Sequence, residues 1–184
     1  MGLLILLGII VAIIFFFIAI YNGLVTARNG YKNSFAQIDV QLQRRYDLIP
    51  NLVETVRGYA AHERGTLDAV VQARNSAIAA AAAQPVARAQ AENALTQTLG
   101  RLFALAEAYP TLRANENFLG LQGELSGTED KIAYARQFYN SAVQTYVTSI
   151  QSIPTNVIAG IGGFQGRDLF QALGEERVPV PVRF

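Results

Sequence analysis

The sequence predicts an all-α protein in which an N-terminal transmembrane helix precedes an antiparallel up-and-down helical bundle. Three observations predict it. Residues 3–20 read LLILLGIIVAIIFFFIAI, without a charged side chain. Apolar residues then recur every three or four positions across residues 24–150, the spacing of one helix face. Prolines at Pro50, Pro85, Pro110 and Pro154 divide this stretch into four helices, or into three helices if Pro50 is only a kink.

Residues 1–22 form the predicted transmembrane anchor. As a helix, residues 3–20 would cover about 27 Å, near the hydrocarbon thickness of a bilayer. A cleaved signal peptide would need a positive n-region and a small-residue cleavage site, and the run from Phe15 to Tyr21 offers neither. Basic residues follow the segment, beginning with Arg28 and Lys32. The positive-inside rule therefore places the N-terminus outside and the bundle in the cytoplasm, on a single-pass protein of the cell (inner) membrane.

The predicted bundle covers residues 23–153 and begins with two helices on either side of Pro50. The seam of the first helix consists of Leu24, Tyr31, Phe35, Ile38 and Leu42. Pro50 has no N–H and disfavours helix at Ile49, so we expect the helix to end or kink there, with Asp47 capping the next one. The second helix continues into the alanine-rich tract at residues 77–83.

Two further helices complete the predicted bundle. The third spans residues 86–109, with a seam of Leu95, Leu99, Leu102, Ala106 and Tyr109. The last is the longest, at residues 114–153, with a seam of Phe118, Leu121, Leu125, Ile132, Ala135, Tyr139, Ala142, Tyr146 and Ile150. Connections this short predict that successive helices pack antiparallel around one core.

Residues 154–184 differ from the bundle because they are rich in proline and glycine, and we expect an irregular C-terminal tail. It ends in an extended VPVPV stretch at residues 178–182. Four of its apolar residues would be poorly placed in water, and they are candidates for covering the bundle end, for touching lipid or for contacting a neighbouring subunit: Val157, Ile158, Ile161 and Phe164.

The composition argues against several classes of function. Lys plus Arg number 15 and Asp plus Glu 14, so the net charge of +1 is unlike that of a nucleic-acid binder. The chain has no Cys and one histidine, His62, so we expect no metal site and no cofactor. Successive turns carry Asp39, Asp47, Glu54 and Glu63, but a di-iron centre would need Glu-x-x-His on two helices, which is absent. We therefore expect no enzymatic activity.

A set of polar residues clusters in the sequence around Pro50 and near the ends of the other helices. One interpretation is a solvated face with pairs inside single helices, such as Glu54 with Arg57. The other is an interhelical polar network that fixes the register of the bundle, with a ligand pocket as a less favoured variant. The set consists of Asp39, Arg44, Arg45, Asp47, Asn51, Glu54, Arg57, Arg74, Asn75, Asn115, Glu116, Arg136 and Asn140.

Several motifs resemble those of the LemA family, in order along nearly the whole chain. They are IDVQLQRRYDLIPNLVETV at residues 38–56, GYAAHE at 58–63, ARN at 73–75, EAYP at 107–110, ANENF at 114–118, ARQFYN at 135–140 and PTN at 154–156. The resemblance implies a single-pass membrane protein with an antiparallel helical bundle. It supplies no catalytic residues. Some members of the family are encoded beside a membrane metalloprotease, which suggests a partner.

Two functions fit these observations. The first is a structural scaffold at the membrane, which self-associates into a homo-oligomer through its long helices and apolar tail. The second is an adaptor or regulator of another membrane protein, such as a quality-control metalloprotease, which predicts a monomer or small oligomer bound to that protein. The lipid bilayer is a partner in both. Transport is disfavoured, because one uncharged transmembrane helix offers no polar pathway.

Overall fold

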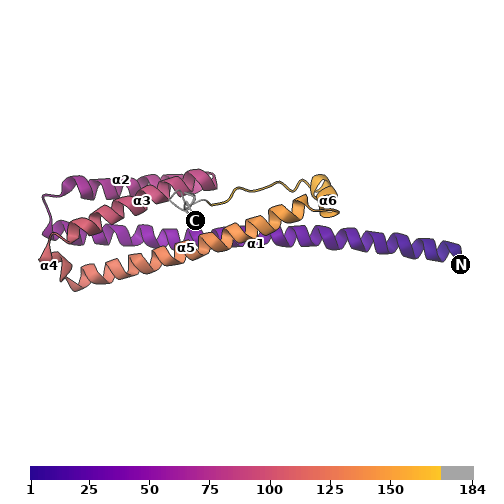
Figure 1. Cartoon of the computed structure of the whole chain (residues 1–184), viewed down its shortest axis with the longest axis horizontal. Helices are drawn as coiled ribbons and strands as arrows, with labels where there is room; N and C mark the ends of the chain where they lie inside the picture. The colour runs from indigo at the N-terminus through magenta and orange to yellow at the C-terminus, as the bar shows by residue number, and fades with distance from the viewer. Residues whose placement is uncertain (171–184) are drawn as a thin grey trace, which may run out of the picture. The chain divides into compact units, whose positions relative to one another are not determined.

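The computed structural model describes residues 1–170, which contain no strand. Its α-helices are α1 (Gly2–Tyr59), α2 (Arg64–Ala79), α3 (Pro85–Ala106), α4 (Pro110–Arg113), α5 (Glu116–Gln151) and α6 (Thr155–Ile161), and a short 3₁₀-helix, η1 (Ala80–Ala82), follows α2 (Figure 1). The predicted all-α class is confirmed, and α3 and α5 lie within a few residues of their predicted bounds. The stretch at residues 178–182 lies outside the described part of the chain.

The described chain groups into two compact units, and the long helices α1 and α5 each contribute to both. Unit 1 consists of Met1–Asp39 and Ala133–Leu169. Unit 2 contains Val40–Ile132 together with Phe170. Each unit therefore has a piece of α1 and a piece of α5, joined to the rest by continuous helix.

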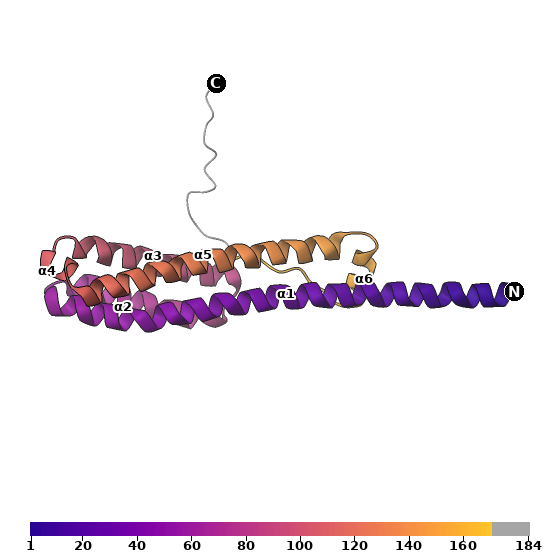
Figure 2. The ribbon, with the colours of Figure 1, turned by 90° about the horizontal axis from the view of Figure 1, so that it is seen from below.

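In unit 2, the C-terminal part of α1, then α2, α3 and the N-terminal part of α5 run alternately up and down (Figures 1 and 2). The chain reverses at residues 60–63 and 80–84 and through α4, so each reversal is short. The core contains the apolar seam residues of the four helices, of which the largest fully buried ones are Leu42, Ile49, Leu52, Leu95, Leu102 and Ile132, together with Leu112 of α4 and Phe170. This arrangement follows from amphipathic helices joined by short connections.

Of the two alternatives predicted at Pro50, a helix end or a kink, the helix end is wrong. Helix α1 continues through Pro50 to Tyr59, and Asp47 lies inside the helix instead of capping a new one. A proline inside a helix leaves the carbonyl four residues earlier without its N–H donor, and here that carbonyl belongs to Tyr46. The Nε of Arg74 on α2 donates a hydrogen bond to this carbonyl at 2.8 Å. A side chain from another helix therefore replaces the bond that Pro50 cannot make.

Unit 1 is built on the piece of α1 that follows the apolar segment. Its core consists of Leu24, Tyr146, Ile158, Ala159 and Phe164. Two tyrosines of α5 hold the chain that follows α6, because the hydroxyls of Tyr146 and Tyr139 donate to the carbonyls of Gln165 and Asp168, at 2.9 and 3.0 Å. Burial raises the pKa of both tyrosines, so both remain neutral donors at physiological pH.

The expectation of an irregular tail from residue 154 is wrong at its start, where α6 forms a helix. Two of the glycines that suggested irregular chain, Gly162 and Gly163, instead end this helix. The N–H of Phe164 donates to the carbonyl of Ala159 at 3.0 Å, and Gly163 has φ of 66°. This is a Schellman motif, which turns Phe164 back onto its own helix beside Ile158. A Cβ added at Gly162 would lie 2.6 Å from the Phe164 ring, so the motif requires both glycines.

We expect Gly163→Ala to destabilise unit 1 by about 1–2 kcal/mol, because an L-residue is strained at positive φ. Thermal unfolding of the detergent-solubilised protein would measure the loss. Gly166→Ala is the matched control, since Gly166 has ordinary φ and open space where its Cβ would lie. Equal melting temperatures for the two variants would contradict the role assigned to Gly163.

Among the described residues, one helix, α1, is long and apolar enough to cross a membrane. None of its most apolar window is buried inside the protein. Its large side chains point outward along residues 3–18, with Phe15 67% exposed. This segment therefore presents an apolar surface that no other described part of the chain covers.

Candidate functional site

Each of the four long helices in unit 2 places a polar residue where its apolar seam would otherwise continue. These residues are Arg45 in α1, Arg74 in α2, Glu92 in α3 and Thr128 in α5. Each follows an apolar seam residue by three or four positions and precedes another by a similar interval, so each faces inward. Arg45, Glu92 and Thr128 are buried, and Arg74 is half-buried.

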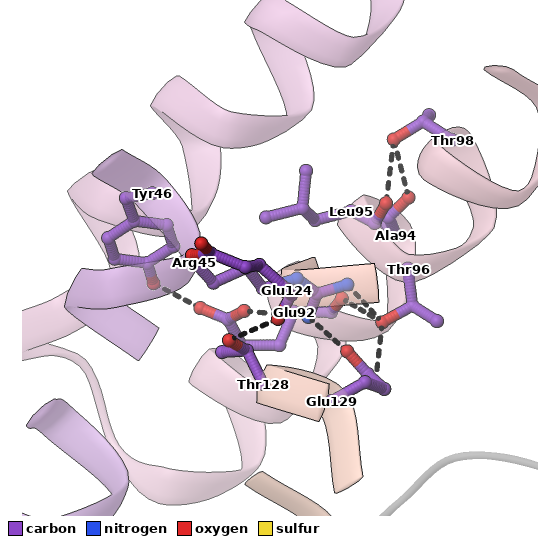
Figure 3. A network of polar contacts seen from close by, with 10 residues as sticks. All are labelled: Arg45, Tyr46, Glu92, Ala94, Leu95, Thr96, Thr98, Glu124, Thr128 and Glu129. Atoms are coloured by element: carbon purple, nitrogen blue, oxygen red, sulfur yellow. Dashed lines mark hydrogen bonds and ion pairs between the residues drawn. The ribbon is translucent and has the colours of Figure 1, made fainter. Parts of the chain in front are cut away.

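Arg45 is the centre of the contacts between these helices (Figure 3). Its Nη1 lies 3.6 Å from Oε2 of Glu92 and 3.1 Å from Oε2 of Glu129. Its Nη2 donates a hydrogen bond to the Thr96 hydroxyl at 2.8 Å. The Arg45 and Glu92 side chains are 3% and 0% exposed, whereas Glu129 is 37% exposed. One guanidinium therefore connects α1, α3 and α5.

Tyr46 supplies a second contact between α1 and α3. Its hydroxyl donates a hydrogen bond to Oε1 of Glu92 (Figure 3). Burial raises the pKa of Tyr46, and the hydrogen bond and negative charge of Glu92 raise it further, against the opposing charges of Arg88 and Arg45. Tyr46 therefore stays protonated and donates, while both oxygens of Glu92 face partners on α1.

Arg74 extends the contacts to α2. Its hydrogen bond to the Tyr46 carbonyl joins α2 to α1 at the residue whose side chain binds Glu92. Arg45, Tyr46, Arg74, Glu92 and Glu129 thus tie all four long helices of unit 2 at one level. We call this set the polar layer.

A cavity of about 280 Å³ lies next to the polar layer, between α3 and α5. Arg45, Thr96 and Glu129 line one side of it, and apolar residues including Leu99, Phe103 and Leu125 line another. The cavity is small for a ligand pocket, since such pockets typically measure about 300–1,000 Å³.

The geometry suits the polar layer to fixing helix register. Burying Arg45 and Glu92 removes both from water, which is costly unless each meets its partners, and the contacts of Arg45 reach from α1 to both α3 and α5. Within residues 1–170, no group of three or more His, Asp or Glu residues is placed to hold a metal ion. His62 is exposed.

The structure distributes the polar residues singled out in the sequence over several places. Only Arg45 and Arg74 join the polar layer. Arg44 pairs with Glu124 at 3.5 Å on the surface. Two interactions stay within α1: Arg57 pairs with Glu54, and Gln43 donates to Asp47.

The remaining members of that set lie elsewhere. Asn51, Asn75 and Glu116 are exposed. The Asn115 side chain accepts the N–H of Phe118 at 2.9 Å, at the start of α5, and donates to the Tyr59 hydroxyl at 3.0 Å. Asp39, Arg136 and Asn140 belong to unit 1. The members of the set are therefore distributed over both units, some of them on the surface.

Sequence reasoning missed Glu92, Thr96, Glu129 and Tyr46. A signal for Glu92 was present, because extending the seam of Leu102, Leu99 and Leu95 towards the N-terminus by the same spacing leads to Glu92 and then to Arg88 and Ala89, all buried. The same extension on α1 leads from Leu42 to Arg45. A charged residue at a seam position indicates a buried partner on a facing helix.

The four apolar tail residues divide into two pairs. Ile158 and Phe164 are 7% and 8% exposed and belong to the core of unit 1. Val157 and Ile161 are 58% and 84% exposed. The first pair therefore fixes α6 in place, and the second pair faces outward.

Comparison with known proteins gives one family and several relatives. The model of the LemA family matches residues 34–184. The magnetosome protein MamQ 2 of Paramagnetospirillum magneticum is 28% identical over 175 residues, covering 82% of this chain and 64% of the relative. MamQ of Magnetospirillum gryphiswaldense is 26% identical over 174 residues, with the same two shares of 82% and 64%.

Protein LemA of Metamycoplasma hominis is 28% identical over 171 residues, covering 91% of this chain and 77% of the relative. The chain thus spans 64% of the length of the MamQ proteins that it matches. None of these names states a reaction.

Proposed function

Because the chain belongs to the LemA family, we propose that it is a non-enzymatic scaffold, anchored by α1 in the cell membrane, that self-associates into a homo-oligomer. The observation that carries the proposal is a pair of aromatic rings on the outer face of α5. Tyr134 and Phe138 lie one helical turn apart and are 72% and 53% exposed. Exposed aromatic side chains are enriched where proteins bind one another.

The apolar segment at residues 3–20 supports the anchor. It is long enough to cross a bilayer once, and no described part of the chain covers it. Arg28 and Lys32 follow it, and α1 has no acidic residue before Asp39. By the positive-inside rule, the N-terminus then lies outside and the bundle lies in the cytoplasm.

A second copy of the chain is the proposed occupant of the α5 face. Anchored copies share one orientation and are concentrated in one membrane, so the same surface meets itself repeatedly. A two-fold axis along the membrane normal would place Tyr134 and Phe138 of one copy against those of the next. The face continues over Ser141 and Thr145, whose short side chains let two helices approach closely.

The polar layer supports a structural role over a catalytic one. Its central charges, Arg45 and Glu92, are buried against each other. The Glu92 carboxylate also accepts a hydrogen bond from the hydroxyl of Tyr46. A general base must reach the proton that it removes from a substrate. The buried position of Glu92 suits holding helices together.

Cysteine cross-linking in membranes tests the proposed face, because the native chain contains no Cys. We expect Phe138→Cys and Tyr134→Cys to form covalent dimers on mild oxidation. Ala133→Cys is the control, since this exposed position lies about 100° round the helix from Tyr134. Equal dimer yields at all three positions would indicate random collision and contradict the assigned face.

The alternative function, an adaptor of another membrane protein such as a quality-control metalloprotease, uses the same exposed surfaces. It predicts that Tyr134→Cys and Phe138→Cys, each labelled with a photoreactive thiol reagent, cross-link to a different protein instead of to a second copy. A cross-linked product whose mass differs from twice that of the chain would favour the adaptor.

A further inference from the structure

We infer that α6 and Ile153, two residues before it, form a second contact with the membrane, in which Ile153, Val157 and Ile161 enter the lipid interface beside α1. These side chains are 85%, 58% and 84% exposed, among the most exposed large aliphatic residues beyond the apolar segment. Val157 and Ile161 lie one turn apart on the same face of α6. This inference rests on the proposed anchoring of α1.

The position of α6 in unit 1 sets its level relative to the bilayer. The ring of Phe164, which follows α6, lies 5.5 Å from the Tyr21 ring, measured between centroids. The guanidinium carbon of Arg28 lies 5.0 Å from the centroid of the same Phe164 ring. Leu24 packs in the same cluster as Ile158, with Ile20 against it. All these contacts fall on α1 from residue 20 to residue 28, where the apolar segment ends. Figures 1 and 2 both show α6 beside this part of α1.

The distances along α1 agree with an interfacial position. Residues 3–20 span about 27 Å of a hydrocarbon core about 30 Å thick. The turns that hold α6 begin where this core ends, at the level of the headgroups. An interfacial helix buries its apolar face about 5–10 Å into this boundary, which long aliphatic side chains can reach.

The chemistry of the segment also favours lipid. No Asp, Glu, Lys or Arg occurs between Arg136 and Arg167. Helix α6 itself reads TNVIAGI, with no ionisable group. On α1 the nearby charges are Arg28 and Lys32, which suit anionic headgroups. An exposed aliphatic face without charges, fixed next to a transmembrane segment, matches a lipid interface better than water.

The core contacts hold α6 in this orientation. Ile158 and Ala159 are buried on a different face of α6 from Val157, and the Schellman motif at Gly163 places Phe164 in the same core cluster. The outward face is therefore fixed by the same residues that bury the inward face.

Single-tryptophan quenching tests the contact, because the native chain has no Trp. The full chain is reconstituted in phosphatidylcholine vesicles containing anionic lipid, with bromine on the acyl chains near the headgroup. Ile161→Trp probes α6, and Phe16→Trp probes the anchor. Gln37→Trp is the aqueous control, an exposed site of α1 about 25 Å beyond residue 20.

We expect brominated lipid to quench the emission of Ile161→Trp to an extent close to that of Phe16→Trp, and to leave Gln37→Trp unchanged. Quenching of Phe16→Trp without Ile161→Trp would overturn the α6 contact while leaving the anchor in place. The emission of Ile161→Trp then identifies what covers it, since a blue-shifted spectrum indicates a protein neighbour and a red-shifted one indicates water. Failure to quench Phe16→Trp would overturn both the anchor and the contact that rests on it.

Discussion

Arg45→Ala should lower the free energy of unfolding by about 3–5 kcal/mol, because it removes one partner of the buried ion pair between Arg45 and Glu92. It also removes the contacts to Glu129 and Thr96. The loss would appear as a lower melting temperature of the detergent-solubilised protein. Binding of any partner to the outer surface of the bundle should be unaffected, since Arg45 is 3% exposed.

The adjacent arginine provides a matched control. Arg44 pairs with Glu124, but both side chains are more than half exposed. Arg44→Ala should therefore change stability by about 1 kcal/mol or less. The double variant Arg45→Leu with Glu92→Leu should recover part of the loss, because it also removes the buried carboxylate that Arg45→Ala leaves without its Arg45 partner. An unchanged melting temperature for Arg45→Ala would contradict the role of the polar layer.

Arg74→Ala should cost about 1.5–3 kcal/mol, the range for hydrogen bonds made by charged groups, because it leaves the Tyr46 carbonyl without a donor. The cost should be smaller when Pro50 is replaced by alanine. An alanine at position 50 has an N–H that can bond to the Tyr46 carbonyl along the helix, so the carbonyl no longer depends on Arg74.

A double-mutant cycle of Pro50→Ala and Arg74→Ala measures this dependence. We expect a coupling energy of about 1 kcal/mol or more between the two positions. Any packing lost with the Arg74 side chain is common to both backgrounds and cancels in the cycle. Additive effects would show that Arg74 does not compensate for Pro50.

The fold class and the helix seams could be predicted from the sequence, because apolar spacing depends on local geometry alone. The continuation of α1 through Pro50 could not be predicted in this way. A proline weakens a helix by a local rule, but here a residue 24 positions later, Arg74, supplies the missing donor. The break instead falls at residues 60–63, where the hydroxyl of Tyr109 reaches Glu63 at 3.1 Å. Tertiary contacts of this kind leave no periodic signal.

The polar layer was predicted only in part for a related reason. Arg45 was one of several charged residues near Pro50 in the sequence. The residues next to it in the sequence gave no indication of which residues it would contact. Glu92 lies on another helix, and its position in an apolar seam was the available clue. Exposed charges such as Glu54 and Arg57 follow the same helical spacing, so spacing alone could not separate them from the buried ones.

In the tail, the amino-acid composition predicted less helix than the structure contains. Its glycines and Pro154 suggested irregular chain, yet Gly163 ends α6 through its positive φ. Composition does not distinguish a glycine that breaks a helix from one that terminates a short helix in a defined way. The burial of Ile158 and the exposure of Val157 depend on packing against α1 and α5, which the sequence of the tail does not contain.

The mass of the full-length protein extracted in native lipid nanodiscs tests the scaffold proposal most directly. One chain has a mass of 20.0 kDa. We expect a single uniform species at a multiple of this mass, which Tyr134→Lys combined with Phe138→Lys converts to smaller species. A monomer in nanodiscs, unchanged by these substitutions, would contradict self-association and direct attention to the membrane protein that accompanies it.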